Sequence, residues 1–265
     1  MQLKHITCSD PREFNDIHDI VELGQISPRV EIAVQMHPSK ASPGMPRNQW
    51  FNELIDYVII DQIDDVNLAV HVNQEWCAEI CRTGEIPQEL RRFFYERRFA
   101  NWPVIKRWQL NMSKNVADNI NVRALRKLFA HHPENDFIIQ YNDNTQEAAK
   151  KLYDAHARFS VLYDASGGRG LSPTGWGAPV FTGVAQGYSG GLSPENVAEN
   201  LDKIARVAVL PNVRYDEKHK PVYSLQERRD IWIDAEDKLK TDDKFDIARA
   251  KEYIINAENW LKKQR

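Results

Sequence analysis

The chain has 265 residues, of which 42% are hydrophobic and 28% are charged. This is typical of a globular protein with enough apolar side chains for a sizeable core. A net charge of −3 argues against nucleic acid as the main partner, and no apolar run is long enough to cross a bilayer. The sequence begins without a signal-peptide pattern, and Cys8, Cys77 and Cys81 cannot form a disulfide framework, so we expect a cytoplasmic protein.

Short apolar segments alternate with amphipathic helices along the whole chain. This rhythm is typical of parallel strands that are joined by crossover helices. The predicted strands are Leu3–Thr7, Val30–Gln35, Val66–Val70, Ile105–Leu110, Phe137–Gln140, Ser160–Tyr163, Val180–Ala185 and Arg229–Ile233. We therefore predict a single (β/α)8 TIM barrel over residues 1–265, with an open doubly wound sheet as the alternative.

Two segments are longer than a minimal strand–helix unit, at about residues 73–103 and 210–228. The first contains Arg91–Phe99, where arginines are interleaved with aromatic residues. We interpret it as a solvated helix face, with a nucleic-acid or partner surface as the alternative. The second has two prolines and many charges, and we expect a surface excursion before the last strand.

Two glycine-containing segments follow the predicted sixth and seventh strands. Tyr163–Gly170 reads Tyr-Asp-Ala-Ser-Gly-Gly-Arg-Gly, so Asp164 would emerge at a strand end, where a half-desolvated carboxyl suits a general acid. Tyr188–Val197 reads Tyr-Ser-Gly-Gly-Leu-Ser-Pro-Glu-Asn-Val. Its glycines precede a helix start, and bare backbone at a helix N-terminus suits a phosphate.

The two segments together resemble the sixth and seventh strand ends of the phosphoribosylanthranilate isomerase family. The family pattern is Leu-Leu-Asp, then Gly-Gly-x-Gly, then Ser-Gly-Gly-Leu-x-Pro-Glu-Asn-Val, and the likeness in specific residues covers Ser160–Leu201. The resemblance implies a (β/α)8 barrel, a sugar-phosphate-like small-molecule ligand and no cofactor. It also implies an Amadori rearrangement, in which an aldose amine becomes a ketose amine.

The resemblance also implies roles for single residues. Asp164 would be the catalytic acid that opens the sugar ring. The family base is a cysteine in Lys-Ile-Cys-Gly, and counting back from the first helix places Thr7 or Cys8 there, whereas aligning from Lys4 places Ile6 there. Cys8 is our candidate base. The candidate substrate and phosphate ligands are Ser189, Gly190, Gly191, Arg169, Asp234 and Lys40.

The last strand end departs from the family pattern. The family has Asp-x-Ser-Ser-Gly there, and this chain has Asp234 followed by Ala-Glu-Asp-Lys, so Glu236 and Asp237 are expected to repel a phosphate. Two other functions therefore stay open. One is a barrel that binds a phosphorylated ligand, or a partner, without turnover. The other is a metal-dependent barrel hydrolase, whose ligands would come from separate strand ends: His37, His71, Asp164 and Glu236.

Overall fold

The computed structural model describes residues 2–98, 101–164, 175–208, 213–215, 221–223 and 230–264. Within this part of the chain, eight parallel strands close into a barrel in the order β1-β10-β7-β6-β5-β4-β3-β2. The strands are β1 (Gln2–Ser9), β2 (Val30–Met36), β3 (Asn67–Val72), β4 (Ile105–Leu110), β5 (Asp136–Tyr141), β6 (Ser160–Asp164), β7 (Gln186–Ser189) and β10 (Asp230–Ala235). The closed strand order confirms the predicted (β/α)8 fold and excludes the open sheet.

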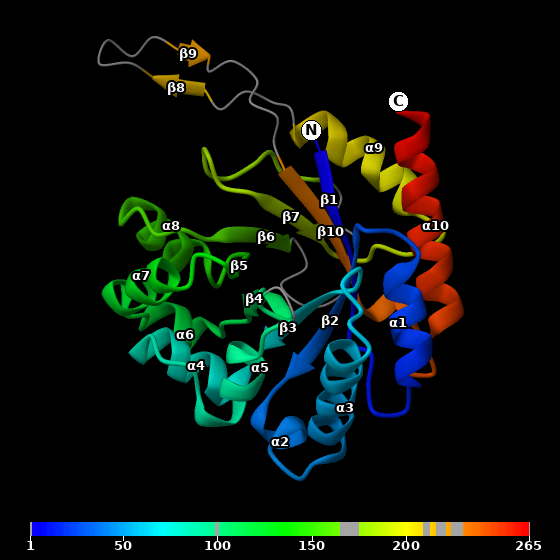
Figure 1. The fold of residues 1–265 in the computed structure, drawn as a ribbon. Helices are drawn as coiled ribbons and strands as arrows, with labels where there is room; N and C mark the ends of the chain where they lie inside the picture. Colours follow the sequence, from blue (N-terminus) through cyan, green and yellow to red (C-terminus); the bar gives the residue numbers. More distant parts are fainter. Residues whose placement is uncertain are drawn as a thin grey trace.

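Helices surround the barrel (Figure 1). They are α1 (Ile17–Gln25), α2 (Pro38–Ala41), α3 (Pro46–Ile60), α4 (Gln74–Thr83), α5 (Arg91–Tyr95), α6 (Lys114–Asp118), α7 (Val122–His131), α8 (Gln146–Asp154), α9 (Val197–Ala208) and α10 (Ile247–Lys263). The C-terminal α10 packs against both α1 and α9, so the two ends of the chain meet where β10 pairs with β1 (Figure 1). None of the described helices has the length and hydropathy that crossing a bilayer requires.

The seventh barrel strand lies later in the chain than the sequence predicts. The predicted segment Val180–Ala185 contains Gly183 at φ +75°, and the chain turns there. The segment is therefore a loop. Its apolar side chains pack on neighbouring elements, and Phe181 stacks on Tyr153 with ring centroids 4.6 Å apart. The strand itself, Gln186–Ser189, is short and partly polar, so an apolar run was the wrong signal. The other seven predictions overlap the observed strands.

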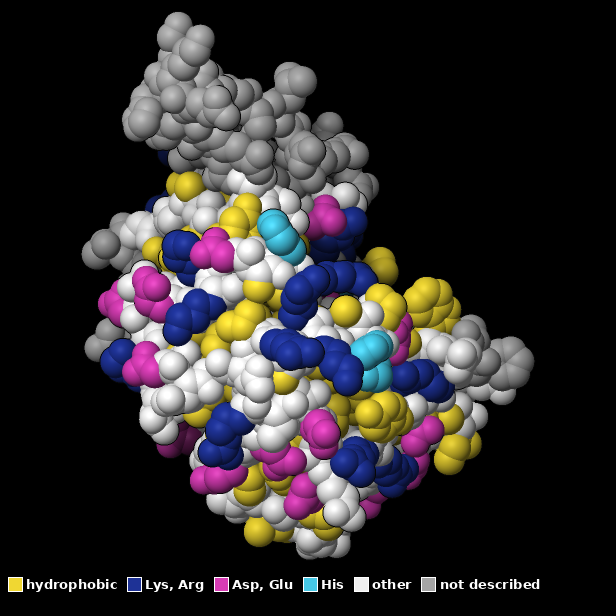
Figure 2. Space-filling view, turned by 90° about the vertical axis from the view of Figure 1, so that its left-hand side faces the viewer, with side chains coloured by type: hydrophobic (Ala, Val, Ile, Leu, Met, Phe, Trp, Pro, Cys, Tyr) yellow, Lys and Arg dark blue, Asp and Glu magenta, His cyan; other side chains and the backbone are white. Residues whose placement is uncertain are grey.

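Residues of the two long segments fall into separate elements. The first segment holds α4, a 3-10 turn (Gln88–Leu90) and α5. In α5, Phe93 is buried while Arg92 is exposed, which agrees with a solvated face there. Arg98 departs from the prediction, because it is buried beyond the helix and donates to the carbonyl of Ile63 at 2.8 Å. Figure 2 shows the side that carries α7 and α8, where Lys and Arg are interspersed with Asp and Glu. In the second segment, β8 (Val213–Tyr215) pairs with β9 (Pro221–Tyr223) in antiparallel fashion.

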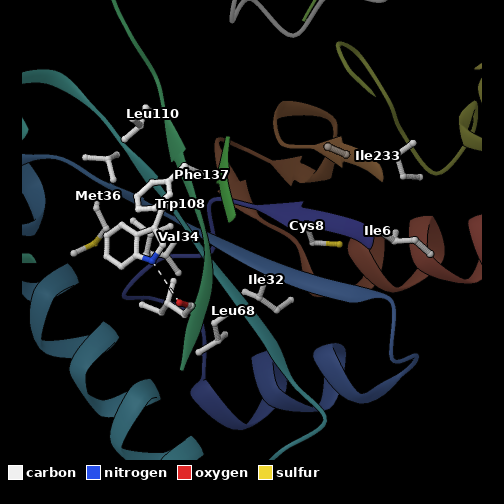
Figure 3. Close-up of a cluster of buried hydrophobic side chains, with 14 of the residues drawn as sticks. Ile6, Cys8, Ile32, Val34, Met36, Leu68, Trp108, Leu110, Phe137 and Ile233 are labelled. Atoms are coloured by element: carbon white, nitrogen blue, oxygen red, sulfur yellow. Dashed lines mark hydrogen bonds between the residues drawn. The ribbon is translucent and has the colours of Figure 1, made fainter. Parts of the chain in front are cut away.

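The main apolar core lies between the strands and the helices. Alternate residues of each strand point outward into it, such as Ile6, Ile32, Leu68 and Ile233 (Figure 3). The buried helix faces close over these side chains, and Ile254 of α10 is one example. This layer supplies most of the hydrophobic stabilisation, and it leaves the inside of the barrel to a different set of residues.

The inside of the barrel is filled by one large ring and one buried ion pair. Trp232 packs with Ile138 and Leu162 in a small cluster of its own. The Arg107 guanidinium lies over the Trp232 ring, 4.2 Å from its centroid. Arg107 Nη1 also donates to Glu31 Oε1 at 2.7 Å. Burial would raise the pKa of Glu31, but Arg107, His5, the hydrogen bond from Thr7 and His71 together hold that pKa below its ordinary value.

Gly187 of β7 faces the Trp232 ring. A Cβ at position 187 would lie 2.1 Å from Cε2 of Trp232, which no packing tolerates. We predict that Gly187→Ala lowers the free energy of unfolding by about 3 kcal/mol or more, because the ring is held between Arg107 and the barrel wall. The matched control is Gly175→Ala, since a Cβ there meets nothing within 4 Å. Urea denaturation of both variants measures the effect, and equal stability would show that Trp232 moves freely.

Candidate active site at the barrel mouth

A pocket of about 340 Å³ opens at the carboxyl ends of the barrel strands, which is where (β/α)8 enzymes place their chemistry. Seven strands contribute, and their last inward-facing residues are polar. The lining residues include Gln35, His71, Asn73, Gln109, Asn111, Gln140, Asp164, Ser189, Gly190, Gly191, Asp234, Glu236, Asp237 and Lys238. The structure therefore brings together five of the sequence-predicted site residues: Asp164, Ser189, Gly190, Gly191 and Asp234.

Two carboxylates flank Ser189 in the floor of this pocket. Asp164 on β6 and Asp234 on β10 are both in register with Ser189 on β7, so the three residues form one row across neighbouring strands. Both carboxylates are buried. Gln140 Nε2 donates to Asp164 Oδ2 at 2.7 Å, and Ser9 Oγ donates to Asp234 Oδ1 at 2.6 Å. These bonds hold the two carboxyl groups in position at the base of the pocket.

The pKa of Asp234 is raised from its ordinary value of 3.8 to about 7. Burial is the main cause, and the negative charges of Glu31 and Asp164 add to it, whereas the Ser9 hydrogen bond and Arg107 oppose it. A carboxyl group with this pKa is present in both protonation states near neutral pH. Asp234 can therefore take up or release a proton, a role that the sequence had not assigned to it.

Cys8 does not reach the pocket. Its side chain is fully buried and lies in the outer apolar layer with Ile6 and Ile32 (Figure 3). Burial also raises the pKa of its thiol above the ordinary value. The next residue, Ser9, points into the barrel and takes the place at the end of strand one. The following Asp10 has φ +72°, a left-handed conformation that suits the glycine of Lys-Ile-Cys-Gly.

The register of Ser9 could not be read from the sequence. A one-residue shift turns a strand side chain to the opposite face, and the marker of the correct register is the left-handed residue. In this chain that residue is Asp10, so no glycine identifies it. On the structural register, Ser9 stands where the family pattern has its cysteine.

The glycine pair after β7 lines one side of the pocket. Gly190 has φ +123° and Gly191 has φ +61°, so both adopt conformations that favour glycine. Asn196 closes the turn before α9, because its side chain accepts from the Ser193 amide at 2.9 Å and donates to the Gly191 carbonyl at 2.8 Å. Lys238 lines the same pocket from the loop after β10. Arg169 lies outside the described residues.

The two acidic residues after β10 line the first pocket, and both are paired there with Lys240. Glu236 Oε2 accepts from Gln35 Nε2 at 2.9 Å, and Lys240 Nζ lies 3.1 Å from Glu236 Oε1. Lys240 also lies 3.3 Å from Asp237 and 3.0 Å from Asp10. Both carboxylates are thus paired on the β1–β2 side of the mouth. Their charges are partly neutralised, and the expected repulsion of a phosphate at the glycine pair is weakened.

A second pocket of about 680 Å³ adjoins the first on the side of β1–β4. The two pockets share Gln35, Asn73, Asn111 and Glu236 as a common wall. Lys40, predicted as a substrate ligand, lines this second pocket and not the first. It is joined there by Arg12, His37 and Arg47.

The histidines proposed for a metal site are separated by the same wall. His37 lines the second pocket, and His71 lines the first. Among the described residues, no group of three or more His, Cys, Asp or Glu side chains could hold a metal ion. The metal-dependent hydrolase therefore gains no support from the arrangement of this mouth.

Comparisons with known proteins found similarity at the level of solved structures. No family model and no curated protein matches the chain. N-(5'-phosphoribosyl)anthranilate isomerase from Pyrococcus furiosus is 13% identical, with 97% of this chain and 100% of that chain covered and a TM-score of 0.49. KGPDC from Streptococcus mutans is 12% identical, with coverage of 97% and 99% and a TM-score of 0.47. The barrel assignment rests on the strand order, and the roles of residues rest on the site geometry.

We predict that Asp234 makes stability depend on pH. Between pH 4 and pH 7 the folded state keeps this carboxyl protonated while the unfolded state loses its proton, so the contribution of Asp234 to the free energy of unfolding falls as the pH rises. The fall amounts to about 4 kcal/mol for a shift of this size. Relative to Asp234→Asn, the wild type should lose about this much stability from pH 4 to pH 8 in urea denaturation. A constant difference would contradict the raised pKa.

We also predict that Ser9→Ala raises the pKa of Asp234 further. The hydrogen bond from Ser9 stabilises the ionised carboxylate, and this variant removes it. The carbon-13 resonance of the Asp234 carboxyl reports its titration directly. The matched control is Ser113→Ala, a serine that caps α6 and does not line this pocket. A midpoint that stays unchanged in Ser9→Ala would show that Ser9 does not set the proton affinity of Asp234.

Proposed function

We propose that the protein is an isomerase of the phosphoribosylanthranilate isomerase type, acting on a sugar phosphate or an aminosugar phosphate. The observation that carries the proposal is the row of Asp164, Ser189 and Asp234 beside Gly190 and Gly191. Two buried carboxyl groups supply an acid and a base at one end of the pocket. The glycine backbone before α9 offers amide groups and a helix dipole to a phosphate.

In the proposed reaction Asp164 is the acid. It protonates the ring oxygen of a sugar that carries nitrogen at C1. The C1–O bond breaks as the nitrogen lone pair forms a C1=N bond, so the ring opens to a cationic imine. Gln140 Nε2 donates to Asp164 Oδ2 and so holds this carboxyl group at the end of β6.

Asp234 is the base in the second step. Its carboxylate removes the proton from C2, the C2–H electrons form a C1=C2 bond, and the C1=N electrons return to nitrogen. The enolamine becomes the ketose amine when C1 gains a proton and the C2 hydroxyl loses one. The pKa of Asp234, about 7, gives it both the affinity to take this proton and the ability to release it at neutral pH.

The remaining parts of the ligand have places on either side of these carboxylates. Gly190, Gly191 and Lys238 would hold the phosphate. The group on nitrogen would extend toward the second pocket, where Lys40 and Arg12 stand. Arg12 is paired with Asp10, so Lys40 is the cation that an anionic substituent would meet first.

Loss of either carboxyl group should abolish most of the turnover. With phosphoribosylanthranilate as substrate, Asp164→Asn and Asp234→Asn should each lower kcat on the order of 10²–10⁴-fold, the usual contribution of general acid–base catalysis. Asp143→Asn is the control, because Asp143 is exposed at the β5 end and does not line the pocket. If the wild type turns over this substrate and Asp164→Asn does so at a similar rate, Asp164 is not the acid.

Phosphate binding can be tested separately from turnover. Inorganic phosphate should shift the backbone amide resonances of Gly190 and Gly191, and Lys238→Ala should weaken its binding roughly 2- to 5-fold, as for one partly exposed charge. Lys244→Ala, an exposed lysine outside the pocket, is the control. Binding without any turnover would favour the non-catalytic barrel, and unmoved glycine amides would contradict the phosphate site.

A further inference from the structure

A chain of hydrogen-bonded side-chain amides runs along the wall between the two pockets. Gln35 Nε2 donates to Glu236 Oε2 at 2.9 Å, and Asn73 Nδ2 donates to Gln35 Oε1 at 2.6 Å. Asn111 Nδ2 donates to Asn73 Oδ1 at 3.0 Å, and Gln109 Nε2 donates to Asn111 Oδ1 at 2.9 Å. The chain begins at the loop after β10 and crosses the ends of β2, β3 and β4.

The direction of this chain is fixed at two points. The Glu236 carboxylate accepts, so Gln35 must turn its NH₂ group toward it. Asn73 Nδ2 also donates to the backbone carbonyl of His71 at 2.9 Å, and a carbonyl oxygen can only accept. Every amide group therefore donates toward Glu236 and accepts from the next residue.

Gln109 is the last member, and its carbonyl oxygen is left over. Gln109 Oε1 is buried and has no hydrogen-bond partner among the described residues. The residue is 3% exposed and lines the first pocket. A buried acceptor without a partner is unfavourable until a ligand supplies a donor. The donations along the chain also polarise this oxygen, which strengthens it as an acceptor.

We propose that Gln109 Oε1 determines specificity by accepting a hydrogen bond from a hydroxyl or ammonium group of the ligand. The inference rests on the proposed function, because the donor belongs to the same sugar phosphate that Gly190 and Gly191 hold. The site thereby selects a polyhydroxylated or amino-substituted ligand. It rejects one that turns an ether, carbonyl or carboxylate oxygen toward β4, because two acceptors would then face each other. Glu236 acts as a positioning residue through the chain.

The ligand contact is tested with ribose 5-phosphate, using inorganic phosphate as the reference ligand. Gln109→Met has a similar length and no strong acceptor, so it should bind ribose 5-phosphate about 5- to 100-fold more weakly, as for one lost hydrogen bond. Its affinity for inorganic phosphate should match that of the wild type, which shows that the variant is folded.

Equal affinity of the wild type and Gln109→Met for ribose 5-phosphate would overturn the proposal while leaving the phosphate site intact. If neither inorganic phosphate nor ribose 5-phosphate shifts the amide resonances of Gly190 and Gly191 in the wild type, the proposed function is wrong. The proposed ligand contact at Gln109 is then wrong as well.

The chain itself is tested without a ligand. The side-chain NH₂ protons of Gln109 should exchange slowly with solvent in the wild type and faster in Glu236→Ala, where the chain loses its anchor. Fast exchange at Gln109 in the wild type would mean that its NH₂ group faces the pocket, and this would overturn the proposal.

Discussion

The buried guanidinium of Arg107 fixes the inside of the barrel, and the mouth is built on it. Arg107 on β4 lies over the ring of Trp232, which comes from the opposite strand β10, and it binds Glu31 on β2. A lone charge here would be very costly, so the cation, the carboxylate and the ring stabilise the fold only together. Trp232 fills the space that Gly187 leaves. Packed side chains therefore fill the barrel below the pocket, and the pocket is confined to the carboxyl ends of the strands.

The same interior sets the proton affinity of the candidate catalytic group. Asp234 stands two residues after Trp232 on β10, about 7 Å further along the strand. Burial is the largest influence on its pKa, and Glu31 and Arg107 act on that pKa in opposite directions. An interior ion pair that is neutral overall thus lets desolvation place the pKa of Asp234 near 7.

The sequence predicted the barrel, because alternating apolar strands and amphipathic helices report the outer core directly. It also placed Asp164, Gly190 and Gly191 at one mouth, since strand ends and helix starts are local signals. It failed where the answer depended on neighbouring strands or on the backbone conformation of a single residue. Gly187 of β7 is explained by Trp232 on the neighbouring strand β10, and the register of Ser9 is marked by the left-handed Asp10. The proton affinity of Asp234 likewise depends on burial and on residues of other strands.

The departure from the family pattern after β10 has a physical explanation in Lys240. A phosphate would be repelled by two free carboxylates, but Lys240 binds Glu236, Asp237 and Asp10 at once. Glu236 also accepts a hydrogen bond from Gln35 and anchors the chain of side-chain amides in the wall between the pockets. One lysine thus converts an acidic loop into a support for the wall between the pockets. The mouth is divided into a carboxylate-bearing side at β6–β10 and a cation-bearing side at β1–β4, and a ligand long enough to reach both must cross the wall of Gln35, Asn73, Asn111 and Glu236.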